Sequence, residues 1–583
     1  MINAAPVKEA TAAKVLVEYL KQEGVEYIFG IPGGPLMPLY EAIFETGWIK
    51  PILAKHEQGA AFMADGYARA SGKLGVCCAT TGPGATNLIT GVACAYADSI
   101  PMLVLTAQVA TSSFGKGAAQ ESTSHGIDVV DMFRPITKSS VMLHSPEKMG
   151  DVVRAALRAA LSGRKGPVHI NLPADFMKKT VKANIQHPKS YRVTSSQFDR
   201  GAIVEASKQL LNAKRPVILA GHGVNLSGAH EELRRLAEKL GIPVVTSPKA
   251  KGAFPENHVL SLGVFGFVGS LWAEKYLLSE EPDVLVAVGT SMGELTTCNW
   301  DARLAPSRIL IQIDIDPCEI GKNYPTNLGI EGDAKAILRE LVFQVERDLK
   351  WREDAQPRSL EWIRELKNSS PYCGAPEKMS SEDVPLKPQR VMRELRDALP
   401  SDAVLFVDIG TCMTWAFQYF PVYEPMTFFI NLGLASMGHA VAACVGGKLA
   451  RPGAPVIALA GDCSFAMNGM EVHTAVDHEI PVIWLVLNNG GHGLVHHGEK
   501  IQFGGKFNSS LFRQRLDIAG IAKGLGAAHM RAENPGEVES CLREAIKLKR
   551  PCVIEALIDG SEVPPIAHRI HSLERMFAAG GIQ

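Results

Sequence analysis

The sequence lacks long hydrophobic runs. Its most apolar runs, at 456–461 and 482–487, stop after about six residues at glycine or asparagine, whereas a helix that crosses a membrane needs ~20. The first 24 residues carry Lys8, Glu9 and Lys14 and have no uninterrupted apolar stretch of the kind that a signal peptide needs. We therefore expect no membrane span and no export, and we expect a cytoplasmic protein.

An excess of charge of either sign and paired cysteine motifs are also missing. The 583 residues include 60 Lys and Arg against 61 Asp and Glu, so no basic field favours nucleic acid or an acidic membrane surface. Eleven cysteines contain no CxxC pair, which favours a reducing compartment over a disulfide framework or a zinc site. With 46% hydrophobic and 21% charged residues, the chain is typical of a globular protein with neither nucleic-acid nor membrane partners.

The hydrophobic pattern divides the chain into three α/β domains. Short apolar strands alternate with helical or glycine-rich segments, which is typical of a mostly parallel sheet. Aperiodic polar stretches at 182–197 and about 351–385 predict two linkers. We expect doubly wound parallel sheets in domains at 1–185, 199–350 and 386–583. The expected strands are 27–30, 75–80, 102–107, 168–173, 217–224, 242–247, 282–289, 308–316, 404–410, 456–461, 482–487 and 552–557.

Polar residues follow two neighbouring strands of the third domain. GDCSFAMNG (461–469) and NNGGHG (488–493) place Asp462 and Asn489 at strand ends that face one crevice. Carboxylate and amide oxygens are ligands that Mg²⁺ prefers, and Mg²⁺ in such sites usually also binds phosphates. Alternatively, GD and NN are ordinary turn dipeptides. The pair therefore predicts a site for Mg²⁺ and a diphosphate only together with further motifs.

Further motifs lie in the first domain. KHEQGAAFMADGYARASGK (55–73) puts Glu57 before a helix whose small residues allow another backbone to approach, and TTGPGATN (80–87) follows. With these motifs the sequence resembles the thiamine-diphosphate-dependent decarboxylase and carboligase superfamily, in its acetolactate-synthase-like branch. The resemblance covers nearly the whole chain, and its motifs are collinear. They also include IFGIPGG (28–34), RPITK (134–138), IDIDPCEIGKN (313–323) and LGLASMGHA (432–440).

The resemblance implies roles for residues of the first domain. Glu57 matches the glutamate that hydrogen-bonds the aminopyrimidine ring of the cofactor and promotes removal of the thiazolium C2 proton. The alternative is an acid that stabilises a helix N-terminus. Gly33, Gln120 and Lys138 match positions around the reacting carbon. Their alternatives are a turn glycine and two solvated polar side chains.

The resemblance also implies a cofactor site in the third domain. Asp462, Asn489 and the carbonyl of Gly491 match the ligands of Mg²⁺. Met437 matches the apolar residue that is wedged between the two cofactor rings, although by itself it reads as a core methionine. The complete set of implied cofactor-binding residues is Gly410, Thr411, Cys412, Met437, Gly461, Asp462, Cys463, Ser464, Asn489 and Gly491.

Three positions depart from acetolactate synthases. Ser291 replaces the arginine of an Arg-Phe-Asp-Asp run in the region that holds FAD, so we expect no FAD. Gly498 replaces a tryptophan and Ala119 a phenylalanine, and both losses enlarge the substrate pocket. Histidines near this pocket offer proton transfer, although surface histidines are the commoner case. They are His125, His492, His496 and His497.

The expected activity is decarboxylation of a 2-oxo acid, pyruvate or larger, followed by carboligation to a second carbonyl. The product is an acyloin or an acetolactate-like acid, and the cofactors are thiamine diphosphate and Mg²⁺. The resemblance implies a homodimer or homotetramer, with the first domain of one subunit facing the third domain of another across the cofactor. The alternatives are an FAD-containing housekeeping acetolactate synthase with a regulatory subunit, a simple decarboxylase, an oxidase or phosphate-using acyl transferase, and a non-catalytic paralogue.

Overall fold

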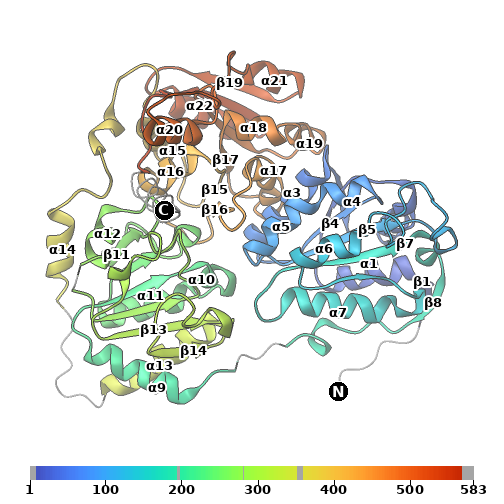
Figure 1. The fold of residues 1–583 in the computed structure, drawn as a ribbon, viewed down its shortest axis with the longest axis horizontal. Helices are drawn as coiled ribbons and strands as arrows, with labels where there is room; N and C mark the ends of the chain where they lie inside the picture. The colour runs from blue at the N-terminus through green and yellow to red at the C-terminus, as the bar shows by residue number, and fades with distance from the viewer. Residues whose placement is uncertain (1–7, 194–196, 280, 351–358, 567–583) are drawn as a thin grey trace, which may run out of the picture.

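The structure is a computed structural model that describes residues 8–193, 197–279, 281–350 and 359–566. Figure 1 shows three α/β bodies, coloured blue to cyan, green to yellow, and orange to red along the chain. Each contains a six-stranded sheet in which all strand pairs are parallel. The predicted fold class is confirmed. The outer ends of the predicted domains, 1–7 and 567–583, lie outside the described residues.

The N-terminal sheet has the order β3-β2-β4-β5-β7-β6. The predicted helix behind Thr11 is α1, and Thr11 Oγ1 accepts a hydrogen bond from Lys14 N at 3.3 Å. The strands are β2 (Tyr27–Gly30), β3 (Lys50–Leu53), β4 (Gly75–Ala79), β5 (Met102–Gln108), β6 (Ser140–Met142) and β7 (Pro167–Pro173). The helices are α1 (Ala12–Gln22), α2 (Met37–Thr46), α3 (Glu57–Ser71), α4 (Pro83–Asn87), α5 (Ile89–Ala97), α6 (Val129–Phe133), α7 (Met149–Leu161) and α8 (Ala174–Met177).

The central sheet has the order β11-β10-β9-β12-β13-β14. The strand expected at 217–224 ends at Ala220, because His222 begins α10. The strands are β9 (Pro216–Ala220), β10 (Val244–Thr246), β11 (Ser261–Val264), β12 (Val284–Val288), β13 (Ile309–Asp314) and β14 (Leu328–Glu331). The helices are α9 (Arg200–Asn212), α10 (His222–Ser227), α11 (His230–Leu240), α12 (Leu271–Leu277) and α13 (Ala334–Lys350).

The C-terminal sheet has the order β16-β15-β17-β18-β20-β19. Its strands are β15 (Val404–Val407), β16 (Phe428–Ile430), β17 (Val456–Gly461), β18 (Ile483–Asn488), β19 (Ala528–Ala532) and β20 (Cys552–Leu557). Its helices are α15 (Pro388–Ala398), α16 (Thr411–Tyr419), α17 (His439–Ala450), α18 (Asp462–Asn468), α19 (Glu471–Asp477), α20 (Gly493–Phe503), α21 (Ile518–Gly524) and α22 (Glu537–Leu548). The motif residues 462 and 489 therefore follow adjacent strands, β17 and β18.

The two predicted linkers include a strand and a helix, which their aperiodic sequences do not predict. The first overlaps β8 (Thr180–Ala183), which pairs antiparallel with β1 (Lys8–Thr11). The second contains α14 (Glu361–Asn368), whose Ile363 is fully buried in the central core. The guanidinium carbon of Arg215 lies 4.6 Å from the Trp362 ring centroid. β8 is stabilised by pairing within the N-terminal domain and α14 by packing on the central domain, although both segments lack a long periodic pattern. Residues 194–196 and 351–358 of the linkers lie outside the described part.

Helices α3 and α17 pack backbone against backbone and join the N- and C-terminal domains in one hydrophobic core. A Cβ on Gly66 would lie 2.0 Å from the carbonyl oxygen of Ala443, and a Cβ on Gly446 would lie 1.9 Å from that of Met63. Only glycine fits at these two positions. The expected close approach of another backbone to the helix after Glu57 is therefore observed, and α17 is the partner.

Across the described ranges, no helix combines the length and the apolar character that crossing a membrane requires.

Candidate active site

Glu57 begins α3, and its carboxylate lies against the turn after β4. The side chain is 8% exposed, and Asn87 Nδ2 donates to Glu57 Oε2 at 2.9 Å. A Cβ on Gly84 would lie 3.3 Å from Glu57 Oε1. The TTGPGATN segment therefore both orients the carboxylate and leaves space beside it.

Gly33 and Gln120 lie at the same edge of the N-terminal sheet. A Cβ on Gly33 would lie 2.3 Å from Thr80 Oγ1, so a larger residue does not fit there. Gln120 has a positive φ of 63°, and its carbonyl oxygen accepts a hydrogen bond from Thr81 Oγ1 at 2.6 Å. The structure thus brings Gly33, Glu57 and Gln120 together around residues 80–84.

Lys138 and His125 have other surroundings. Lys138 Nζ donates to the carbonyl oxygens of Ser162 and Arg164 at 3.0 and 2.7 Å, and also to that of Ala159, and it thereby stabilises the C-terminus of α7. His125 is exposed in the loop after β5, where it lines a surface hollow with His144. Ala119 is exposed in that same loop. The Lys138 side chain is therefore not among the groups that surround Glu57 in this structure.

Asp462 ties together the two loops of the C-terminal motif. It is 1% exposed, and its Oδ2 accepts hydrogen bonds from the N–H groups of Gly490 and Gly491 at 2.8 and 3.0 Å. Burial raises the pKa of Asp462 above its ordinary value, and a bound cation would lower it again. A Cβ on Gly493 would lie 2.3 Å from Asn489 Nδ2, so this glycine leaves room for the asparagine side chain. Asp462 and Asn489 are therefore brought to one place.

The opposite wall is formed by residues after β15. Gly410 precedes α16 with a φ of 138°, and a Cβ on it, as on Gly461, would meet no atom within 4 Å. Cys412 Sγ donates to the carbonyl of Asp408 at 3.2 Å, and Ser464 Oγ donates to that of Ile409. The loop 408–412 thus contacts the start of α18 through Ser464, with open space beside Gly410 and Gly461. Thr411 and Cys463 lie at the first turns of α16 and α18.

Asp408 shapes the turn that carries Met437. Its carboxylate accepts hydrogen bonds from the N–H groups of Gly438 and Ala440, both at 2.8 Å, and it is 1% exposed. A Cβ on Gly438 would lie 2.5 Å from Asn468 Nδ2, a buried donor for which the described residues provide no acceptor. Met437 itself is half-buried beside this turn. The turn therefore presents an apolar side chain next to an unused polar donor.

The residues around Asp462 and Gly410 fit Mg²⁺ together with a diphosphate. Oxygen ligands from Asp462, Asn489 and the Gly491 carbonyl are of the type Mg²⁺ prefers. The open space at Gly410 and Gly461, next to the N-termini of α16 and α18, suits phosphate oxygens. The Gly491 carbonyl also accepts from Gly493 N at 3.0 Å, which leaves one lone pair for a cation.

His492 and the first turns of α20 follow directly after the Gly491 loop. His492 contacts the Phe512 ring edge-on, at 6.3 Å between ring centroids. His496 and His497 are buried, and burial lowers the pKa of both, that of His497 to about 4. A Cβ on Gly498 would meet no atom within 4 Å. The structure therefore has open space at the position where the resemblance places a tryptophan.

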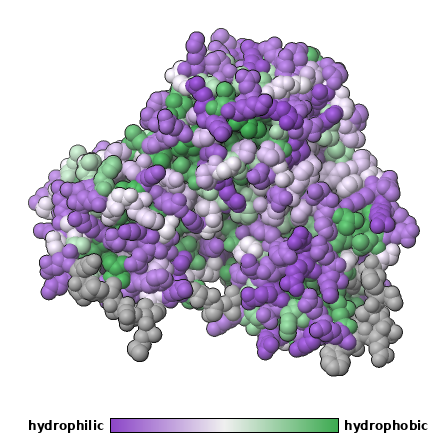
Figure 2. Space-filling model, turned by 180° about the vertical axis from the view of Figure 1, so that it is seen from behind, coloured by the Kyte–Doolittle hydropathy of each residue, from purple (hydrophilic) through white to green (hydrophobic). Residues whose placement is uncertain are grey.

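Within the described residues, no hydrogen bond links the Glu57 carboxylate to Asp462. In the described residues, the hydrogen bond of the Glu57 carboxylate goes to Asn87 of its own domain, and those of Asp462 go to the C-terminal domain. The C-terminal domain exposes apolar side chains near its half. Met467, Met470, Val495 and Phe503 are 49–58% exposed, and Figure 2 shows hydrophobic surface on the upper part of the rear face.

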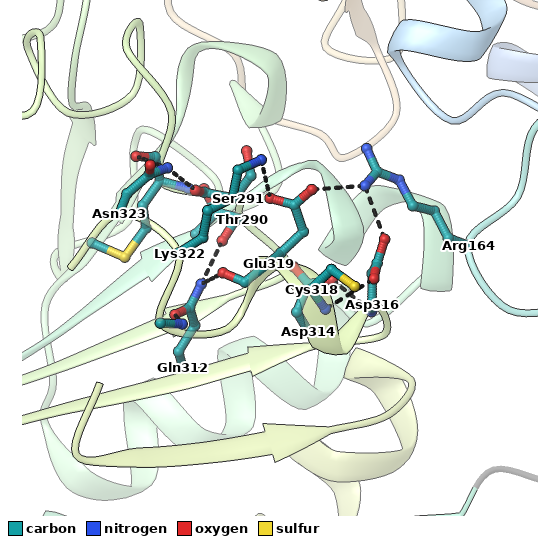
Figure 3. A network of polar contacts seen from close by, with 12 residues as sticks. Arg164, Thr290, Ser291, Gln312, Asp314, Asp316, Cys318, Glu319, Lys322 and Asn323 are labelled. Atoms are coloured by element: carbon teal, nitrogen blue, oxygen red, sulfur yellow. Dashed lines mark hydrogen bonds and ion pairs between the residues drawn. The ribbon is translucent and has the colours of Figure 1, made fainter. Parts of the chain in front are cut away.

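A separate cavity lies between the N-terminal and central domains. Its edge is bridged by Arg164, whose Nη1 lies 3.1 Å from Asp316 Oδ2 and 2.9 Å from Glu319 Oε1 (Figure 3). Lys249 Nζ pairs with Asp98 at 3.1 Å, and Lys165 Nζ donates to the carbonyl of Leu226. The three cations that line this cavity therefore already have partners.

At position 291, where the resemblance places an arginine near FAD, the lining of this cavity has a serine. Ser291 is exposed, supplies no cation, and its carbonyl accepts from Asn323 Nδ2 at 2.9 Å (Figure 3). The lining also includes the carboxylates of Asp314, Glu319 and Asp333, of which Glu319 pairs with Arg164 and Lys322. Both ring nitrogens of His222 are buried there without a hydrogen-bond partner in the described chain.

Two residues of the site were not singled out from the sequence. Asn87, which orients Glu57, is the last residue of TTGPGATN, and its position in that motif was the available signal. Asp408 closes the strand VLFVDIG, and a carboxylate at the end of an apolar strand is unusual enough to mark it. Its role in the turn after Met437 follows only from the folded chain.

Comparison with known proteins identifies the family. The thiamine pyrophosphate enzyme N-terminal TPP binding domain matches residues 10–130, the central domain matches 203–341, and the C-terminal TPP binding domain matches 408–556. The chain belongs to the thiamine pyrophosphate enzymes. The predicted family, with thiamine diphosphate as its cofactor, is confirmed by these matches.

Relatives of this thiamine pyrophosphate enzyme match over nearly their whole length. A probable acetolactate synthase large subunit of Methanocaldococcus jannaschii is 38% identical over 95% of this chain and 93% of its own. The acetolactate synthase isozyme 3 large subunit of Escherichia coli is 35% identical, over 97% and 98%. The acetolactate synthase large subunit of Corynebacterium glutamicum is 34% identical, over 95% and 88%. The acetolactate-synthase-like branch is thus confirmed.

Proposed function

We propose that the protein decarboxylates a 2-oxo acid, pyruvate or larger, and joins the remaining carbon unit to a second carbonyl, giving an acetolactate-like acid or an acyloin. The observation that carries this proposal is the presence of both half-sites, Glu57 with Asn87 and Asp462 with Asn489, in a chain with full-length acetolactate synthase relatives. Thiamine diphosphate supplies the electron sink for this chemistry when bound.

Each residue has a defined task in this proposal. Glu57, buried and oriented by Asn87, exchanges a proton with the aminopyrimidine ring. Asp462, Asn489 and the Gly491 carbonyl would hold Mg²⁺, and the backbone N–H groups at the start of α18 would bind the diphosphate. Met437 shapes the cofactor, and Gly33 and Gln120 adjoin the substrate. The open space at Gly498 supports a second substrate larger than pyruvate.

We propose a homodimer as the smallest active unit, in which Glu57 of one copy faces Asp462 of the other, and a homotetramer is an assembly of two such dimers. Separate half-sites in each chain and exposed apolar side chains near Asp462 support this arrangement. We further propose that the enzyme works in the cytoplasm. We also propose that it works without FAD, because Arg164, Lys165 and Lys249, the cations of the cavity between the N-terminal and central domains, already have partners.

The test is to incubate the purified protein with Mg²⁺, thiamine diphosphate and pyruvate, alone and with branched or aromatic 2-oxo acids. CO₂ release and product mass are followed, and flavin absorbance is recorded. The proposal expects a coupled product, no flavin, and loss of both signals of turnover in Glu57→Gln and Asp462→Asn. Release of CO₂ with only free aldehyde would make the protein a simple decarboxylase. Flavin absorbance in the purified protein would instead support the alternative of an FAD-containing acetolactate synthase.

A further inference from the structure

Helix α19 of the C-terminal domain lies against the segment that leads into Glu57 (Figure 1). Leu53 N donates to His478 Nε2 at 3.1 Å, just beyond the helix, and Lys55 Nζ pairs with Asp477 Oδ2 at 3.1 Å. The carboxylate of Glu471, at the first position of α19, contacts the same segment. One short helix therefore contacts residues 53–56 along their length.

The Glu471 carboxylate is the buried member of these contacts. It is 1% exposed and accepts hydrogen bonds from Lys55 N at 3.1 Å and from His56 N at 3.0 Å. Thr474 Oγ1 donates to it at 2.6 Å. Charge-assisted hydrogen bonds of this kind are stronger than those between neutral groups. Burial raises the pKa of Glu471 above its ordinary value, and these donors oppose that shift.

The local backbone is adapted to this carboxylate. A Cβ on Gly59 would lie 2.2 Å from Glu471 Oε1, so glycine is required where α3 passes the side chain. His56 is the N-cap of α3, and its Nδ1 accepts from Gln58 N at 3.1 Å. The two N–H groups that Glu471 holds therefore belong to the residues immediately before Glu57. Their position sets where Glu57 leaves the loop and enters the helix.

We infer that Glu471 is a positioning residue for the reaction: from the C-terminal domain, it fixes the backbone before Glu57 and thereby the placement of the Glu57 carboxylate. This inference rests on the proposed role of Glu57. In the described part of the chain, the hydrogen bonds of the Glu471 carboxylate come from Lys55, His56 and Thr474, none of which is an implied cofactor-binding residue. Without the Glu471 carboxylate, the N–H groups of Lys55 and His56 would lose their acceptor, and the backbone that leads into α3 would be less constrained.

The test measures Glu57-dependent chemistry apart from stability. Holoenzyme reconstituted with Mg²⁺ and thiamine diphosphate is mixed with deuterium oxide, quenched in acid, and the exchange of the cofactor C2 proton is read by NMR. The variants are Glu471→Ala, the isosteric Glu471→Gln, and Asp477→Asn as the control, which breaks only the partly exposed contact of the same helix with Lys55. Glu57→Gln is the reference, and thermal unfolding is recorded for all.

Glu471→Ala is expected to slow C2 exchange and kcat by about tenfold to a hundredfold, since small misplacements of catalytic groups have effects of this size, while KM for pyruvate changes much less. Glu471→Gln keeps one acceptor oxygen and is expected to lie between Glu471→Ala and the native protein. Asp477→Asn is expected to stay within about twofold, as for an exposed pair.

Native exchange rates in both folded Glu471 variants would overturn the inference, even if their unfolding temperatures fall. If Glu471→Ala does not fold, Glu471→Gln alone decides. Native exchange in Glu57→Gln would instead refute the proposed role of Glu57, and with it this inference, so the two failures are distinct.

Discussion

Arg69 is the centre of a buried ion-pair cluster, and its replacement by methionine tests how the domains are held together. Arg69 Nε donates to Asp65 Oδ2 at 2.5 Å, and Nη2 donates to Asp98 Oδ2 at 2.9 Å. Asp65 also contacts His439 of the C-terminal domain, and Asp98 pairs with Lys249 of the central domain. All three domains therefore meet at this cluster.

The magnitude follows from what Arg69→Met leaves behind. Asp65 and Asp98 are at most 1% exposed, so each would lose its guanidinium partner without gaining access to water. Burial by itself would raise the pKa of Asp98, but the charges of Lys249 and Arg69 hold it below its usual range. Removing one partner of a buried ion pair costs about 3–5 kcal/mol. We expect the free energy of unfolding to fall by that amount.

Urea unfolding followed by tryptophan fluorescence measures this effect. The control is Arg303→Met, which breaks a pair with Asp301 whose arginine is 61% exposed, and about 1 kcal/mol or less is expected there. Adding Asp65→Asn to Arg69→Met removes a buried carboxylate that would then have lost its arginine partner and kept only His439, so part of the loss is expected to return. The reasoning fails if Arg69→Met and Arg303→Met have equal effects, or if the added Asp65→Asn destabilises further.

Three other predictions concern packing, pH and specificity. Gly446→Val places side-chain atoms against the Met63 carbonyl. The free energy of unfolding measured by urea titration should therefore fall by at least about 1–3 kcal/mol, and an unchanged unfolding midpoint would contradict the close packing. Burial lowers the pKa of His169 from 6.5 to about 3. Between pH 6.5 and 3 the unfolded chain therefore binds more protons at this histidine than the folded chain does. The free energy of unfolding is unaffected by His169 above pH 6.5 and decreases as the pH falls toward 3. His169→Gln should flatten that slope, and an unaltered slope would refute a neutral buried imidazole. Gly498→Trp should lower kcat/KM for bulky second substrates about tenfold or more, with little effect on pyruvate; equal losses for both would refute an open pocket there.

The buried strands could be predicted from sequence, and the edge strands could not. β2, β4, β5, β17 and β18 are continuous apolar runs, since helices cover both faces of a parallel sheet. β3, at the sheet edge, reads KPIL and contains a lysine and a proline. Such edge strands form because a neighbour provides hydrogen bonds, and local sequence does not carry that information.

The candidate site shows the same division. Glu57, Asp462 and Asn489 stand at helix starts and strand ends, where short motifs report position directly. Lys138 also lies in a matching motif, yet its ammonium group stabilises the C-terminus of α7. The role of Glu471 depends on contacts between residues far apart in the sequence, and only the packing of α19 on residues 53–56 reveals it.

The central claim is a carboligation site formed by Glu57 of one copy and Asp462 of another. The direct test is to mix unfolded Glu57→Gln and Asp462→Asn chains in equal amounts, refold them together with Mg²⁺ and thiamine diphosphate, and measure carboligation. Each variant alone should be inactive. Half of the random dimers would be mixed, and each would contain one intact site, so about a quarter of native activity should return. Native protein refolded in the same way sets the scale. No recovery beyond the separate variants, with mixed dimers present, would contradict the claim.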